Sequence, residues 1–292
     1  MKLRRFDTSK IKVRSSGSGG GSRIPGGRGG GIGIGTLIIV AIAYFVFGAD
    51  PMQTLSTVQG AQEGAPAQTR QTSVSEEQVC LRGPYATEAC NALQSLNETW
   101  EPEFRRAGIR FEQPTLDLFT GGRVSTQGCG SASSAAGPFY CPADMGIYID
   151  TGFYDQLAQM AGTGGDFARL YVIAHEYGHH IQNLTGLAAQ VRSAQQQNPR
   201  RSNELQVRME LQADCYAGVW AGKNRQLIER GDLEEGMRAA SSIGDDTLQR
   251  NAGQRINPEG FTHGTSAQRM DALRAGLESA DDSVCDRYFQ FD

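Results

Sequence analysis

Histidine is scarce in this chain of 292 residues, which contains only four. Three of them nevertheless stand within six positions of one another, at His175, His179 and His180. The six cysteines include no Cys-x-x-Cys pair, so a cysteine-ligated zinc site is the weaker interpretation of them. A GxGxG stretch near the N-terminus has no predicted strand before it, so the sequence does not support a phosphate-binding loop there.

Acidic residues are nearly absent from residues 1–30, which hold eight lysines and arginines but one acid, Asp7. This segment carries +7, so the other residues carry −11 of the total of −4. Residues 31–48 contain no charge, and these 18 residues are just long enough to cross a bilayer as a helix. The positive-inside rule then predicts a single-pass membrane protein with a cytoplasmic Gly/Ser-rich N-terminus.

On this interpretation residues 31–48 contact membrane lipid, and everything after them is periplasmic or otherwise extracytoplasmic. A cleaved signal peptide is the alternative, but the basic region is very long for one. An RNA-binding function of the glycine-rich tail is disfavoured because its glycines run straight into the apolar segment. We therefore expect no nucleic-acid partner.

All six cysteines follow the apolar segment, and an even count in an exported domain predicts disulfides. Six cysteines allow fifteen connectivities. Proximity in the sequence favours Cys80–Cys90 and Cys129–Cys141, which leaves Cys215–Cys285, but the connectivity stays open.

Residues 49–78 are polar and are predicted to be a flexible linker, followed by one folded domain over residues 79–292. Residues 110–119 and 145–150 carry β-type side chains and are strand candidates. The small-residue segment between them is predicted to be a loop, and the chain after residue 152 has mainly helical patterns. The expected fold is α+β, predominantly helical, with a small sheet.

The sequence His175-Glu176-x-x-His179 lies within an apolar pattern that predicts a helix. Residues four apart share one helix face, so both imidazoles can reach one ion. Glu176 is rotated by about a quarter turn and can activate a water molecule as general base. The alternative is a pair of histidines satisfied by hydrogen bonds in a helical core. Gly178 would let a second backbone approach this helix.

Catalytic zinc needs three protein ligands and an open position. No histidine follows between His180 and His263, so a third imidazole close behind the motif is excluded. His180 points off the ligand face. The segment "MELQADCYAG" offers Glu210 as the third ligand, and Asp214, four residues later, would accept the free ring N–H of a ligand histidine. The alternative is an ordinary solvated helix face.

The spacing His175-Glu176-x-x-His179 followed by Glu210-x-x-x-Asp214 resembles the Glu-zincin class of metallopeptidases. The whole layout, including "VIAHEYGHHIQ" and "ELQADCYAGVWA", is similar to the neutral zinc metallopeptidase family of bacteria. The resemblance covers most of the chain. It implies a zincin-like domain, one Zn²⁺ per chain and a membrane-anchored peptidase, and it does not name the substrate.

His263 and Arg269 form an element similar to the His-x5-Arg element downstream in membrane-bound Glu-zincins. The resemblance implies that the pair stabilises the oxyanion of the tetrahedral intermediate. Gly264 departs from the proline usual there, so a loop histidine and a helix-capping arginine remain the alternative. A strand at residues 145–150 could hold the substrate as an added strand, or could be an ordinary core strand.

We therefore expect a zinc-dependent peptidase that hydrolyses peptide bonds of envelope or other extracytoplasmic proteins. The competing hypothesis is a zinc-stabilised module that binds such proteins without cutting them. A permanent fourth ligand from His263 would favour that alternative.

Overall fold

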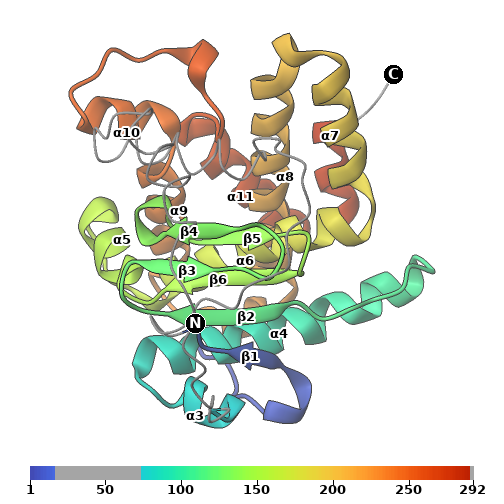
Figure 1. Ribbon diagram of the computed structural model, residues 1–292, viewed down its shortest axis with the longest axis vertical. Coiled ribbons are helices and arrows are strands. Elements are labelled where there is room, and N and C mark those ends of the chain that lie inside the picture. The colour runs from blue at the N-terminus through green and yellow to red at the C-terminus, as the bar shows by residue number, and fades with distance from the viewer. Residues whose placement is uncertain (17–73, 290–292) are drawn as a thin grey trace, which may run out of the picture.

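A computed structural model describes residues 1–16 and 74–289 of the chain. It has the predicted α+β architecture, with many helices around a small sheet (Figure 1). Helices α3 (Glu76–Cys80) and α4 (Pro84–Arg106) precede the segment of residues 115–150, which forms all the described strands except the first. After it come α5 (Phe153–Ala161), α6 (Asp166–Leu184), α7 (Leu187–Gln197), α8 (Ser202–Lys223), α9 (Asp232–Ser242), α10 (Asp245–Asn251) and α11 (Ser266–Ser279).

Within the described residues, the main sheet has four strands in the order β1-β2-β6-β5. Their bounds are β1 (Lys12–Arg14), β2 (Thr115–Phe119), β5 (Phe139–Cys141) and β6 (Gly146–Asp150). The first three strands in this order run parallel, and β5 runs antiparallel to β6. A separate antiparallel hairpin joins β3 (Arg123–Ser125) to β4 (Ser131–Ser133).

Alternation along the strands divides the sheet into two faces, as a period of two residues requires. On one face Leu116, Leu118 and Ile147 join the large core built with the helices. On the other face Phe119 and Tyr148 pack in a smaller cluster with residues of the β3–β4 hairpin. The His175-Glu176-x-x-His179 segment lies in α6, which packs on the face of the sheet that the helices cover (Figure 1).

The two strands predicted from residues 110–119 and 145–150 are present as β2 and β6. However, β6 lies between β2 and β5, so its backbone is paired on both sides and cannot accept an added strand. The edge beside α6 is β5, in a segment that we expected to be only a loop. Three residues are too few to show a strand period in the sequence.

Both disulfides favoured by sequence proximity, Cys80–Cys90 and Cys129–Cys141, are present, and the two remaining cysteines form the third, Cys215–Cys285. The last one links α8 to the C-terminal 3-10 helix at Asp282–Phe289.

The predicted membrane topology is wrong for this structure. In the described ranges no helix has the length and apolar character needed to cross a bilayer. Residues 31–48 lie outside those ranges. In addition β1 pairs with β2 along its whole length, and Arg14 bonds to the buried Asp117, with 2.6 Å between Nε and Oδ2. A tail separated from the domain by a membrane could not make these contacts, so the cytoplasmic N-terminus with an extracytoplasmic domain is overturned.

Candidate metal centre

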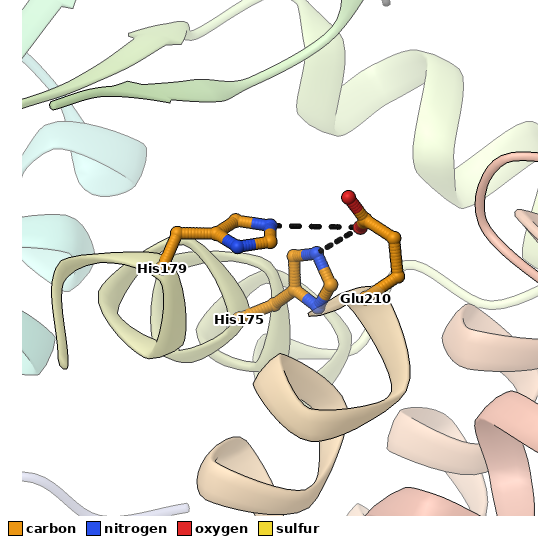
Figure 2. Close-up of side chains that lie close together, drawn as sticks. All are labelled: His175, His179 and Glu210. Atoms are coloured by element: carbon orange, nitrogen blue, oxygen red, sulfur yellow. Dashed lines mark hydrogen bonds and ion pairs between the residues drawn. The ribbon is translucent and has the colours of Figure 1, made fainter. Parts of the chain in front are cut away.

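Helix α6 presents two imidazoles from one face, as the spacing of four residues predicts. His175 and His179 lie with their ring centroids 4.9 Å apart and both point toward Glu210 of α8 (Figure 2). His175 is buried and His179 is partly buried. The helix therefore brings two nitrogen donors to one place at the wall of a cleft.

Helix α8 can approach α6 closely because Gly178 has no side chain. A Cβ at residue 178 would lie 2.7 Å from Ala213 Cα and 2.9 Å from the Ala213 carbonyl oxygen. These distances are shorter than Cβ contacts in real proteins. The predicted role of Gly178 in allowing a second backbone to approach is thus confirmed, and Glu210 and Asp214 stand on either side of this contact in the sequence of α8.

The ligand atoms of His175, His179 and Glu210 all lie within 4.8 Å of one another. Glu210 Oε2 is 3.1 Å from His175 Nε2 and 3.5 Å from His179 Nε2. Tetrahedral zinc with nitrogen and oxygen ligands at about 2.0–2.1 Å places neighbouring ligands about 3.3 Å apart. The three donors therefore fit zinc in both chemistry and spacing.

The far nitrogen of each imidazole is held by a side chain. His175 Nδ1 is 2.7 Å from Asp214 Oδ1, and His179 Nδ1 is 2.9 Å from Gln182 Oε1. Each Nδ1–H donates to its oxygen partner, which leaves Nε2 directed at Glu210. Such outer hydrogen bonds fix the tautomer that a metal requires. Asp214 thus lies where the sequence predicted it.

Asp214 is fully buried and accepts hydrogen bonds from three residues, His175, Arg269 and Tyr171. Arg269 contacts both of its oxygens, with Nε 2.8 Å from Oδ2 and a terminal nitrogen 3.0 Å from Oδ1. The Tyr171 hydroxyl donates to Oδ1 over 2.6 Å. Burial raises the pKa of the Asp214 carboxyl, but Arg269 and His175 lower it more, to about 2. Asp214 is therefore an anion at neutral pH.

Charges around the histidines also set their proton affinity. Burial lowers the pKa of His175, but Asp214 and Glu210 raise it more strongly, to about 10. Burial raises the pKa of Glu210, while His179 and His175 hold it well below its ordinary value. A metal that binds at neutral pH must consequently displace a proton from His175.

Glu176 lines the same cleft as the two histidines, and its side chain is buried. Within the described chain its carboxylate has no hydrogen bond or ion pair. Burial raises the pKa of this carboxyl, and the positive charges of His175 and His179 lower it in part. A desolvated carboxylate with free lone pairs is suited to taking up a proton.

The cleft is mostly apolar. Its walls come from β5, α5, α6, α7 and α8, and from the segment around His263. Among its apolar lining residues are Phe139, Phe153, Met160, Val191, Met209 and Ile243. The candidate metal ligands lie in its wall, so a molecule in the cleft would meet them directly.

His263 also lines the cleft, but it does not join the group of ligand atoms formed by His175, His179 and Glu210. Its backbone N–H donates to Asp245 Oδ2 over 2.7 Å, and its Nδ1 lies 3.3 Å from Asp245 Oδ1. Burial lowers the pKa of His263, while Asp245 and Glu210 raise it to a value above the ordinary one. Gly264 has φ of 87°, a conformation that glycine adopts without strain and proline cannot.

Three residues that shape this centre were not singled out in the sequence: Tyr171, Gln182 and Asp245. Tyr171 lies one turn before His175, and Gln182 lies three residues after His179, so both share the ligand face of α6. Spacing alone could have suggested these two. Asp245 is distant in sequence from His263 and gives no such signal.

Comparisons with known proteins agree with this geometry. Residues 2–288 match a family model described as "Putative neutral zinc metallopeptidase". The chain is 39% identical over 297 residues to "Uncharacterized protein YpfJ" of Escherichia coli K12, which covers 97% of each chain. It is 40% identical over 207 residues to "Uncharacterized protein Rv2575" of Mycobacterium tuberculosis H37Rv, covering 66% of this chain and 67% of the relative.

No solved structure matches the chain. The family match nevertheless spans almost the whole sequence, including both helices that carry the donor atoms. The chain therefore belongs to the family described as neutral zinc metallopeptidases.

Proposed function

We propose that this protein is a zinc-dependent peptidase that hydrolyses peptide bonds of polypeptides bound in the apolar cleft. The observation that carries the proposal is the convergence of three zinc-type donors beside a buried, unpartnered carboxylate. His175, His179 and Glu210 would hold one Zn²⁺. When bound, the ion would polarise the scissile carbonyl and lower the pKa of a water molecule.

Glu176 would act as the general base. Its carboxylate takes a proton from the attacking water as the new C–O bond forms, and then gives that proton to the leaving amine as the C–N bond breaks. The desolvation that raises its pKa brings its proton affinity closer to that required at neutral pH.

His263 would donate a hydrogen bond to the developing oxyanion. Its Nδ1 faces Asp245, so Nε2 is the nitrogen available to the cleft. The raised pKa of His263 favours the protonated, donating form. Arg269 would act indirectly, because its guanidinium is engaged by Asp214 and Tyr171 and thereby fixes the partner of His175.

The substrate would lie against β5, the sheet edge at the cleft, and place apolar side chains among the lining residues. An extended, unfolded segment rich in large apolar residues suits this site better than a charged peptide does.

The alternative, a zinc-stabilised module that binds without cutting, has less support. A structural zinc site usually has four protein ligands, and among the described residues the donor group has three. It also has no use for the Glu176 carboxylate.

The test compares zinc-loaded wild type with Glu176→Gln on β-casein, an unfolded protein, with new termini identified by mass spectrometry. We expect the variant to keep one zinc per chain and to lose about 10²–10⁴-fold in cleavage rate. Glu204→Gln, on the exposed start of α8, is the control and should cut normally. A zinc-loaded wild type that creates no new termini would favour the binding module.

A further inference from the structure

Strand β5 pairs with β6 along one of its two edges. Its side chains alternate, so Phe139 and Cys141 share one face. Phe139 stacks on Tyr148 with ring centroids 4.9 Å apart, and Cys141 is bonded to Cys129. These contacts fix β5 to β6 and to the preceding loop, but they do not determine the position of β5 relative to α6.

Tyr140 points to the opposite face and reaches α6. Its hydroxyl lies 3.0 Å from His180 Nδ1 and accepts a hydrogen bond from Asn183 Nδ2, also over 3.0 Å. Asn183 Nδ2 also donates to the Pro142 carbonyl over 3.4 Å. Among the described residues these are the hydrogen bonds that join β5 and its end to α6. We call Tyr140, His180 and Asn183 the β5 brace.

The donors and acceptors of the brace are consistent with one another. His180 is fully buried, and its Nε2–H donates to the Glu112 carbonyl over 2.7 Å. Its Nδ1 is therefore the acceptor for the Tyr140 hydroxyl, which in turn accepts from Asn183. Tyr177 packs edge-on against the His180 ring, with centroids 5.5 Å apart. The hydrogen bonds of the brace thus run in one direction, from Asn183 through Tyr140 and His180 to the Glu112 carbonyl.

The brace shares its helix with the reacting groups. His180 follows the candidate ligand His179 directly, and Asn183 is one turn further along α6. Tyr140 and Asn183 both line the cleft that contains Glu176. A shift of β5 along or away from α6 would therefore change the distance between a strand-bound peptide and the Glu176 carboxylate.

We propose that His180 and Asn183 are positioning residues that hold the β5 edge, through Tyr140, at a fixed register relative to Glu176. This inference rests on the proposed function. It assigns the second histidine of the His179-His180 pair to substrate alignment rather than to metal binding. Loss of the brace should reduce turnover and blur the choice of scissile bond while zinc binding is kept, because misplacement of a substrate by about 1 Å can cost up to about 10²-fold.

The test uses Tyr140→Phe in the full-length protein, which removes one hydroxyl and keeps the ring. Tyr85→Phe is the matched control, because its hydroxyl bonds to Asp155, and neither residue lines the cleft or contacts the brace. Each protein is assayed for zinc content, for kcat and KM on a peptide that the wild type cuts, and for the set of bonds cut in β-casein. Hydrogen–deuterium exchange of residues 139–141 reports on the brace without requiring activity.

We expect Tyr140→Phe to keep its zinc, to exchange about tenfold faster at residues 139–141, to lose about tenfold in kcat and to cut additional bonds. The glutamine side chain in His180→Gln can still accept one hydrogen bond and donate another, whereas leucine can do neither. We therefore expect His180→Gln to cut fewer additional bonds than His180→Leu. Exchange rates that do not change in Tyr140→Phe would overturn the brace whether or not the wild type cuts. A faster exchange with unchanged cleavage would overturn its role in alignment. A wild type that cuts nothing would refute the proposed function, and the alignment role with it.

Discussion

At the scale of single residues, the centre depends on how a buried negative charge is compensated. Asp214 has no exposure to solvent and faces His175, Arg269 and Tyr171 at hydrogen-bonding distance. A buried ion pair contributes little net free energy relative to apolar packing, but removing one partner leaves the other charge uncompensated. The value of this arrangement is therefore in holding the His175 ring in one orientation.

Asp214→Asn should weaken zinc binding about 10–100-fold, because the amide cannot hold the His175 Nδ1–H as the carboxylate does. It should also reduce the free energy of unfolding by about 3–5 kcal/mol, since Arg269 would be left buried without its anion. Chelator competition and urea unfolding measure the two effects. Asp271→Asn, which breaks an exposed ion pair with Arg274, is the control and should change both little. An unchanged zinc affinity would contradict the role given to Asp214.

His180 gives a pH dependence of stability. Burial lowers its pKa to about 4, below the ordinary value of 6.5. Between these values the unfolded chain binds more protons than the folded one, so this residue's contribution to stability is complete above pH 6.5 and is lost as the pH falls to 4. The loss amounts to about 3 kcal/mol.

Urea unfolding at several pH values would measure this effect as the difference between the wild type and His180→Gln. The wild type should lose more stability than the variant between pH 6.5 and 4, and the difference should be constant above pH 7. If the free energies of unfolding of the two proteins changed in parallel over the whole pH range, the pKa of His180 would not be lowered in the folded protein.

The sequence predicted those site residues that lie on a regular spacing. His175, His179, Glu210 and Asp214 stand on two helices at intervals of four, and the structure brings all of them together. It could not predict Asp245, because the contact between the first residue of α10 and a loop residue 18 positions later follows from the tertiary fold and not from any local period.

At the scale of secondary-structure elements, close packing of helices decides where the donor atoms meet. Gly178 lies against Ala213 in α8, and Gly218 of α8 lies against the backbone of α11 at Leu273. Helix α8 thus packs closely against both α6 and α11, because a glycine lies at each contact. This close packing brings Glu210 to the two histidines and Arg269 to Asp214.

Gly178→Ala should separate α6 from α8. The added methyl group meets backbone atoms of Ala213, which cannot move without shifting the helix. Overpacking of this kind costs about 1–3 kcal/mol, and a clash with backbone atoms belongs at the upper end of that range, above the roughly 1 kcal/mol that alanine gains in helix propensity. We expect a lower unfolding midpoint together with weaker zinc binding.

Gly83→Ala is the control for this substitution, since its Cβ would meet nothing within 4 Å. Thermal unfolding and chelator competition on both variants make the measurement. If Gly178→Ala were as stable as the wild type and bound zinc equally well, the close approach of the two helices would not be required.

Strand length explains which parts of the sheet the sequence revealed. The five-residue strands β2 and β6 show clear β patterns, whereas β3, β4 and β5 have three residues each and lie among glycines and serines. The sequence also did not reveal the order of the strands. Residues 145–150 were a candidate for the sheet edge, but β5 pairs with β6 and makes β6 an interior strand. Neighbours in a sheet are set by the whole fold.

At the scale of the whole molecule, the N-terminal segment is part of the domain core. Phe6, Ile11 and Val13 are buried in the main apolar cluster, and Lys12–Arg14 extend the sheet beyond β2. Charge and hydropathy in the sequence favoured a basic tail separate from the domain. A strand of only three residues has too short a pattern to be recognised within such a basic segment. Only the partner strand, a hundred residues away, makes β1 recognisable.

Arg14→Ala should release this segment. The substitution removes the guanidinium that pairs with the fully buried Asp117, which would keep only its bonds from Ser16. The amides of residues 12–14 should then exchange with deuterium at least about tenfold faster, while zinc content stays the same, because α6 and α8 do not depend on β1 for their contact.

Lys12→Ala, on the same strand with an exposed side chain, is the control, and its residues 12–14 should exchange like those of the wild type. If residues 12–14 of the wild type already exchanged at the rate of an unfolded chain, the N-terminal segment would not be docked in solution. The contacts of β1 would then no longer exclude a basic tail separate from the domain.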